Sequence, residues 1–198
     1  MIFIYYLLIK MKSITLSNGV EMPILGFGTY GLYGNQAYLC TKEALQLGYR
    51  MIDTAHMYGN EKEVGKAIRD SEVPREQIFV VTKMDSRSNS YEKAKKQIQK
   101  SLSDLNLSYI NLYLIYEPYS QSLEMWKALE EAYQQGTLKS IGISKFLGDR
   151  FFEFIKNANI SPMVNQVETH VYSQRLKVQK IFSDKGVALM SWSPLIGY

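Results

Sequence analysis

Short apolar runs recur along the chain, and each pair of runs is separated by enough residues for one helix or turn. These runs are apolar throughout rather than at every second residue, which predicts strands buried on both faces of a parallel sheet. The runs span residues 24–29, 50–55, 78–83, 110–116, 140–144, 163–168 and 187–192.

Between most of these runs, apolar residues are spaced three and four positions apart, as on one face of a helix. Asn60 and Glu61 are also placed to open a helix, and Gly48, Gly136 and Gly186 predict helix ends. This alternation of strands and helices requires a parallel sheet with right-handed crossovers. The patterned segments span residues 37–47, 94–105, 125–133, 151–158 and 176–182.

The number of strands favours a closed arrangement over an open one. Seven strand segments at this spacing fit a (β/α) barrel better than a doubly wound sheet, which periodicity alone leaves open. We therefore predict an α/β fold of the parallel (β/α)8 TIM-barrel type, incomplete, with about seven strands. Residues 13–22, with an Asn18-Gly19 turn, predict a β-hairpin that caps the bottom of the barrel. We expect residues 11–198 to form one domain and residues 1–10 to be an apolar extension.

Composition excludes several classes of function. The formal net charge is only +4, and Lys and Arg are mixed with acids, which indicates solvated helix faces rather than a nucleic-acid surface. The apolar residues 1–9 are about half the length that a membrane span needs. Cys40 is the single cysteine, so no internal disulfide can form, and this fits a reducing compartment. We expect a cytoplasmic protein with neither nucleic acid nor membrane as partner.

Polar residues interrupt the apolar runs mostly at their C-terminal ends. Singly, each has an ordinary explanation, because an Asp after a strand usually caps a turn and a Lys usually lies at the surface. In a parallel barrel, however, these ends all meet on the face where barrel enzymes build their sites. The residues concerned are Asp53, Tyr58, Lys83, Tyr116, Glu117, Ser144, Lys145, Asn165, Gln166, Glu168, Trp192 and Ser193.

Asp53, Tyr58 and Lys83 together suggest a proton donor. A phenol has an ordinary pKa near 10, and a nearby ammonium lowers that pKa by favouring the phenolate. We therefore expect Lys83 to lower the pKa of Tyr58, and Asp53 to hold Lys83 charged and in place. The product would be a tyrosine tuned for acid catalysis.

The remaining rim residues suit carbonyl reduction. Ser144, Asn165 and Gln166 offer hydroxyl and amide groups, and Trp192 offers an aromatic ring. Hydride must come from a nicotinamide, since protein side chains cannot supply it. His56 and His170 lack a third ligand at suitable spacing, so we interpret both as structural and predict no metal site.

Successive blocks of the chain, from about Met11 to the last residue, resemble the aldo-keto reductases in the order of that family. The blocks are ILGFGTY, LGYRMIDTAHMYGNEKEVGKAI, REQIFVVTK, LNLSYINLYLIYEP, LKSIGISKF, NQVETH and SWSPL. The resemblance implies an eight-stranded barrel that uses NADPH to reduce aldehydes and ketones.

The resemblance also implies roles for single residues. Asp53, Tyr58 and Lys83 fall on the catalytic positions of the family, Tyr116 joins them, and Tyr30 falls on an aromatic of the substrate pocket, which Tyr58 and Tyr116 also line. The implied cofactor-binding positions are Gly28, Thr29, Asp53, Ser144, Lys145, Gln166, Trp192, Ser193 and Leu195.

Three features depart from the family pattern. Tyr116 stands where the family usually has a histidine that orients the carbonyl, and Lys145 stands where an asparagine joins the carboxamide contacts. The sequence also stops at Tyr198, before the expected eighth strand and the region that grips the 2′-phosphate. We expect unpaired edges on the first and seventh strands, which leaves self-association through them open.

Two functions follow from this sequence. The first is an NADPH-dependent reductase of small carbonyl substrates, with NADH not excluded, because the 2′-phosphate site is absent from the sequence. The alternative is a truncated homologue with impaired catalysis that acts as a nucleotide-sensing or scaffold subunit.

Overall fold

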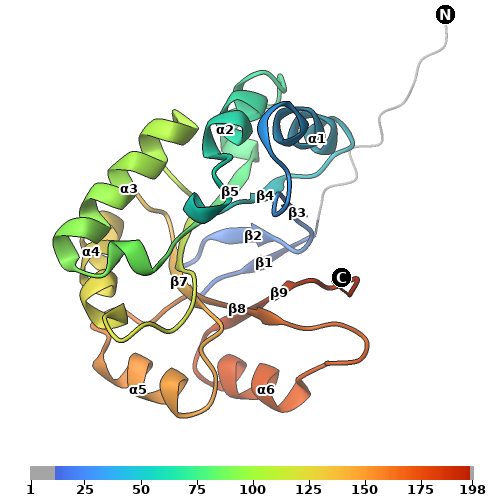
Figure 1. The fold of residues 1–198 in the computed structure, drawn as a ribbon. Coiled ribbons are helices and arrows are strands. Elements are labelled where there is room, and N and C mark those ends of the chain that lie inside the picture. Colours follow the sequence, from blue (N-terminus) through green and yellow to red (C-terminus); the bar gives the residue numbers. More distant parts are fainter. Residues whose placement is uncertain (1–11, 197–198) are drawn as a thin grey trace, which may run out of the picture.

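The computed structural model describes residues 12–196, and seven of its strands form one curled parallel sheet (Figure 1). Each strand pairs with the next along the chain, as short right-handed crossovers require. The strands are β3 (Phe27–Gly28), β4 (Met51–Asp53), β5 (Phe79–Met84), β6 (Leu112–Ile115), β7 (Ile141–Ser144), β8 (Val164–Glu168) and β9 (Ala188–Trp192).

Six α-helices of the described chain form an arc around the outside of the sheet (Figure 1). Gly48 and Gly136, after the first and fourth of these helices, have φ of +97° and +75°, which glycine adopts without steric cost. The helices are α1 (Gly34–Gln46), α2 (Glu61–Arg69), α3 (Tyr91–Leu105), α4 (Ser122–Gln134), α5 (Asp149–Asn157) and α6 (Leu176–Asp184).

The predicted incomplete barrel is confirmed. The sheet curls into a half-barrel, and β3 and β9 are its two edge strands. The first strand is shorter than predicted for residues 24–29, because β3 pairs with β4 only at Phe27 and Gly28. Ile24 and Leu25, which precede it, are 57% and 51% exposed.

The predicted N-terminal hairpin is also confirmed. Strands β1 (Ser13–Thr15) and β2 (Glu21–Pro23) pair antiparallel in a separate sheet. Asn18, in the turn, donates from Nδ2 to the carbonyl oxygen of Lys139 at 2.9 Å and to Oγ of Ser140 at 3.2 Å. Because these residues directly precede β7, the hairpin lies at the N-terminal ends of the strands, as expected for the bottom of a barrel.

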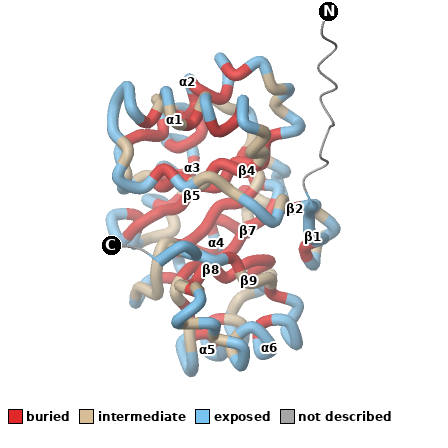
Figure 2. The backbone as a smooth tube through the Cα atoms, turned by 90° about the vertical axis from the view of Figure 1, so that its right-hand side faces the viewer, coloured by how far each residue is buried: buried red, intermediate tan, exposed pale blue. Residues whose placement is uncertain are grey.

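The core lies between the sheet and the helices (Figure 2). Strands β5, β6 and β7 are buried along their whole length, which explains why they are apolar throughout. Helices α2 and α3 approach closely at Gly65, where a Cβ atom would lie 2.1 Å from the carbonyl oxygen of Leu105. Any larger residue at that position would force the two helices apart.

Two further expectations concern the N-terminal extension and membrane-spanning segments. The apolar extension at residues 1–10 lies outside the described residues. Among residues 12–196, no helix has the length and apolar character to cross a membrane.

Candidate functional site

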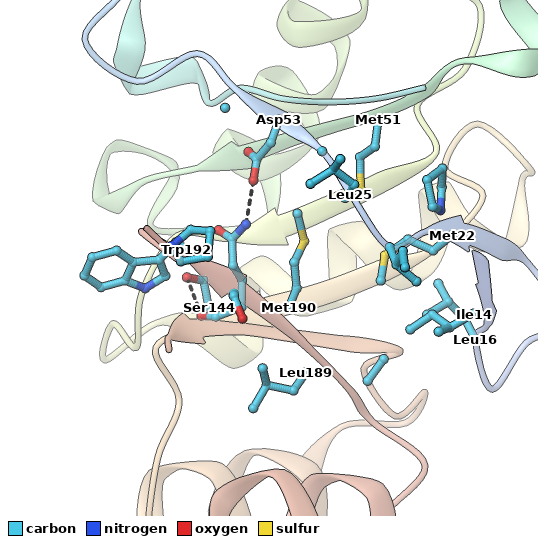
Figure 3. Close-up of a pocket in the computed structure, with 18 of the residues that line it drawn as sticks. Ile14, Leu16, Met22, Leu25, Met51, Asp53, Ser144, Leu189, Met190 and Trp192 are labelled. Carbon is cyan, nitrogen blue, oxygen red and sulfur yellow. Dashed lines mark hydrogen bonds between the residues drawn. The ribbon is translucent and has the colours of Figure 1, made fainter. Parts of the chain in front are cut away.

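A cavity of about 1120 Å³ runs through the interior of the half-barrel. Figure 3 shows its two ends, with Ile14, Leu16 and Met22 at the apolar end and Asp53 and Trp192 at the polar end. The polar end is formed by the carboxyl ends of the strands. Side chains that are far apart in the sequence therefore lie together at this end of the cavity, which we call its mouth.

Most of the predicted site residues line this cavity. Leu195 does not, since it is 92% exposed. Asn165 lies on the opposite face of β8 from Gln166 and donates from Nδ2 to the carbonyl oxygen of Phe146 at 2.7 Å. The predicted residues that line the cavity are Gly28, Thr29, Tyr30, Asp53, Tyr58, Lys83, Tyr116, Ser144, Lys145, Gln166, Glu168, Trp192 and Ser193.

The centre of the polar end is an ion pair between Lys83 and Asp53. Lys83 is only 3% exposed, and its Nζ also donates to the carbonyl oxygen of Thr54 at 2.9 Å. Asp53 ends β4, and the parallel register places it opposite Val81 of β5, two residues before Lys83. The alternation of side chains then turns Lys83 to the same face as Asp53, so the sheet itself sets this contact.

Tyr58 lies beside this pair at the end of the short helix η1 (His56–Tyr58). The Nζ atom of Lys83 is 5.3 Å from the centroid of its ring, and the Tyr30 ring packs edge-on at 5.1 Å. The predicted lowering of the Tyr58 pKa is wrong. Burial and then the negative charge of Asp53 raise this pKa, because both disfavour the phenolate. Lys83 directs its charge to Asp53 and Thr54 instead.

Tyr116 and Lys145 form a second group at the rim. The Tyr58 and Tyr116 rings are neighbours, with centroids 6.3 Å apart. The interaction with the Tyr116 side chain lowers the pKa of Tyr58, and the interaction with Tyr58 raises the pKa of Tyr116. Burial is the largest cause that raises the pKa of Tyr116 to about 12. The Nζ atom of Lys145 lies 4.4 Å from the centroid of the Tyr116 ring and 3.3 Å from Oε2 of Glu117. A charged network therefore occupies the positions at which the sequence departs from the family pattern.

Gln166 and Ser144 place an amide and a hydroxyl next to the ion pair. Gln166 donates from Nε2 to Oδ2 of Asp53 at 2.5 Å, and Ser144 donates from Oγ to the carbonyl oxygen of Gln166 at 2.9 Å. Trp192 lies at the same end of the cavity, and its buried Nε1 has no hydrogen-bond partner among the described residues. These groups can bind a flat, polar ring with a carboxamide substituent.

Sequence reasoning missed the role of Asn60, which it assigned only to the start of a helix. The side chain makes no capping hydrogen bond to α2. It is fully buried, donates to the carbonyl oxygens of Thr29 and Leu32 at 2.9 and 3.0 Å, and accepts from Thr54 at 2.7 Å. Asn60 thus joins the loop that carries Tyr30 to the loop that carries Tyr58. No local sequence signal could have indicated these partners.

The two histidines lie away from this cavity. Nδ1 of His56 is 3.4 Å from Oε2 of Glu61, and Nε2 of His170 is 3.6 Å from Oε1 of Glu168. Neither histidine is among the described residues that line the cavity.

The fold and the site together define a barrel protein with a polar pocket at the carboxyl ends of its strands. The sequence model of a protein family, described as Aldo/keto reductase family, matches residues 24–197 of the chain. Glyoxal reductase of Bacillus subtilis is 40% identical over 93% of this chain and 67% of its own length. The chain belongs to the aldo/keto reductase family.

Solved structures agree with this membership. MGS-M4, an aldo-keto reductase enzyme from a deep-sea metagenome library, matches with a TM-score of 0.92 and 44% identity, over 94% of this chain and 69% of its own. An aldo-keto reductase of Bombyx mori in complex with NADP matches with a TM-score of 0.86 and 30% identity, over 92% of this chain and 66% of its own. The chain thus spans about two thirds of the length of its relatives.

Proposed function

We propose that this chain forms the catalytic pocket of an NADPH-dependent reductase that converts aldehydes or ketones to alcohols. The observation that carries the proposal is the buried Lys83–Asp53 ion pair beside the phenol of Tyr58, at the polar end of a large cavity. Phenol, ammonium and carboxylate together provide a proton donor and a counter-charge for the phenolate that proton transfer leaves behind.

The residues at the mouth fit a nicotinamide cofactor. When bound, such a cofactor supplies the hydride. The Gln166 amide and the Ser144 hydroxyl match a carboxamide in their hydrogen-bonding capacity, and the unpartnered Nε1 of Trp192 provides a further donor. The cavity volume of about 1120 Å³ is also sufficient for a large ligand.

Tyr58 would donate its proton to the carbonyl oxygen of the substrate. Its raised pKa keeps the phenol protonated at neutral pH, so the proton is present before reaction. Because an alkoxide is a stronger base than a phenolate, proton transfer to it remains favourable despite that high pKa. The Nζ atom of Lys83, 5.3 Å from the centroid of the Tyr58 ring, would be a positive charge near the phenolate that remains, although it is paired with Asp53.

The direct test combines turnover and binding. We expect NADPH oxidation with a neutral aromatic aldehyde, and we expect Tyr58→Phe to reduce kcat by about 10²–10⁴-fold. Quenching of Trp192 fluorescence by NADPH should persist in that variant. Equal rates for the two proteins would contradict the role of Tyr58. A parallel titration with NADH tests the preference between the two cofactors.

Two observations favour the alternative of a nucleotide-binding protein with impaired catalysis. Gln166 already donates to Asp53 at 2.5 Å, and the charged Lys145 stands at a position that contacts the carboxamide in the family. A nicotinamide would therefore compete with existing contacts. Fluorescence quenching by NADPH without oxidation, over a panel of aldehydes, would support this alternative.

A further inference from the structure

A second cluster of ligand-type side chains lies outside the cavity, between three elements of the fold. It contains His56 at the start of η1, Glu61 at the start of α2 and Asp104 in the last turn of α3. One ligand atom from each residue lies within 4.8 Å of the other two. The close approach of α2 and α3 at Gly65 explains how residues so distant in sequence meet.

The carboxylate of Glu61 is the group that points to a missing ligand. Glu61 is 3% exposed, and its Oε1 accepts a hydrogen bond from Thr82 at 2.7 Å. Its Oε2 is buried without a hydrogen-bond partner among the described residues, and it lies 3.4 Å from Nδ1 of His56. A buried carboxylate oxygen is costly unless a cation or a donor satisfies it. Oε2 therefore faces the cluster without the hydrogen bond or the cation that a buried carboxylate oxygen needs.

The donor set indicates which cation would fit. One imidazole nitrogen with two carboxylates suits Zn²⁺, which binds nitrogen and oxygen ligands, better than Mg²⁺ or Ca²⁺, which prefer oxygen alone. In a tetrahedral zinc site the ligand atoms stand roughly 3.4 Å apart, given bonds of about 2.1 Å. The distance of 3.4 Å between Nδ1 of His56 and Oε2 of Glu61 already matches this spacing. The three ligand atoms lie within 4.8 Å of one another, so a small inward movement of Asp104 would complete the set.

Asp104 is free to make that movement. Its side chain is 16% exposed, and it is held by Lys100, four residues earlier on the same helix, at 2.7 Å. Lys100 is 53% exposed, so water can solvate its ammonium if Asp104 turns toward a cation. A cation can replace the Lys100 contact with little loss.

We propose that His56, Glu61 and Asp104 form a Zn²⁺ site with a water molecule as the fourth ligand. This ion would connect η1 and α2 to α3. Because His56 begins the same short helix that Tyr58 ends, the ion would anchor the turn that carries Tyr58. The site is separate from the reductase pocket, and its occupancy can be measured without turnover.

The test is calorimetric titration of the chelator-treated protein with ZnSO4. We expect one Zn²⁺ per chain and at least tenfold weaker binding for His56→Gln and for Asp104→Asn. Both changes preserve side-chain size, and Asp104 is near the surface, so both variants should fold. Zn²⁺ should also raise the Tm of the wild type but not that of either variant.

His170→Gln is the matched control, because this histidine faces one carboxylate, Glu168, at 3.6 Å, and belongs to no cluster of three ligand-type side chains among the described residues. Its affinity for Zn²⁺ should equal that of the wild type. Titration with Co²⁺ gives a second measurement, since a thiolate charge-transfer band would place the ion at Cys40 instead. The proposal is overturned if the wild type does not bind Zn²⁺ at micromolar concentrations, if either variant binds it as tightly as the wild type, or if that band appears.

Discussion

Tyr58 and Tyr116 lie edge to face at the mouth of the cavity, with ring centroids 6.3 Å apart and ring planes at 88°. Two phenols are therefore neighbours where the family pattern combines a phenol with an imidazole. A phenol can donate one hydrogen bond to a carbonyl oxygen, as an imidazole can, but it reaches further from the backbone. In the proposed reductase, the Tyr116 hydroxyl would be a second neutral donor to the substrate oxygen, beside Tyr58.

Replacement of Tyr116 tests its contribution to catalysis. We expect Tyr116→Phe to lower kcat/KM for a neutral aldehyde by about tenfold, since one hydrogen bond to the developing charge is lost. Tyr116→His should restore or exceed the wild-type value. Steady-state NADPH oxidation measures both, with NADPH affinity from fluorescence as the control. A Tyr116→Phe variant as active as the wild type would show that this hydroxyl does not contact the substrate.

Alkaline pH should destabilise the fold through its buried phenols. The pKa of Tyr116 rises from 10.0 to about 12 on folding, mainly because of burial. Below pH 10 both states keep the proton, so this group does not change stability. Between about pH 10 and pH 12 the unfolded state loses its proton first, and the free energy of unfolding falls as pH rises. Tyr58, Tyr113 and Tyr119 are shifted in the same direction.

Urea unfolding at a series of pH values measures this effect. Tyr116→Phe should lose stability less steeply than the wild type above pH 10. Tyr172→Phe, at an exposed position, is the control for the loss of a tyrosine hydroxyl as such. Identical slopes for the wild type and Tyr116→Phe would contradict the assignment.

Loss of the Asp53 charge should destabilise the protein strongly. Lys83 is 3% exposed, so Asp53→Asn leaves a buried ammonium without its counter-charge. Breaking such a pair costs about 3–5 kcal/mol. The exposed pair of Lys180 with Asp184 gives the control, because Asp184→Asn should cost about 0.5 kcal/mol or less. Equal urea midpoints for the two variants would refute this difference.

Lys145→Asn should improve both cofactor binding and stability. Lys145 has φ of +65°, a left-handed conformation that asparagine adopts more readily than lysine. An amide would also restore a neutral hydrogen bond to a carboxamide, which corresponds to about fivefold tighter NADPH binding. Lys145→Met removes the charge without adding an amide, so it should not show this gain. Fluorescence titration compares the three proteins.

The edge strands predict association at high concentration. β3 and β9 each have a neighbour on one side only within the described sheet, and unpaired strand edges readily pair with other chains. We expect sedimentation velocity to show a larger mean mass as concentration rises. Ser191→Lys places a charge on the exposed part of β9 and should reduce this association, whereas Ser120→Lys in a loop should not. Concentration-independent monomers would contradict the prediction.

The fold was predictable because its signals are local. Uninterrupted apolar runs indicate buried strands in a chain of this kind, and the order of their pairing follows from short right-handed crossovers. Polar residues at the ends of those runs then had to meet at one mouth. The boundaries of β3 were not predictable, since they depend on how far β4 extends beside it.

The electrostatics of the site could not be predicted from residue types. Whether Lys83 lowers the pKa of Tyr58 depends on where its ammonium points, and the fold directs it to Asp53 and Thr54. Burial then decides the direction of the shift. The proximity of Asp104 to His56 depends on helix packing at Gly65, which no spacing of ligands in the sequence reveals.

Two of the three hydrogen bonds of Asn60 end on main-chain carbonyl oxygens, those of Thr29 and Leu32. Main-chain atoms are the same whatever side chain a residue carries. Residues of that loop can therefore be exchanged to suit different ligands while the spacing between the two pocket walls is retained. The Asn60 amide thus holds the shape of the pocket through main-chain atoms, whichever side chains the loop carries.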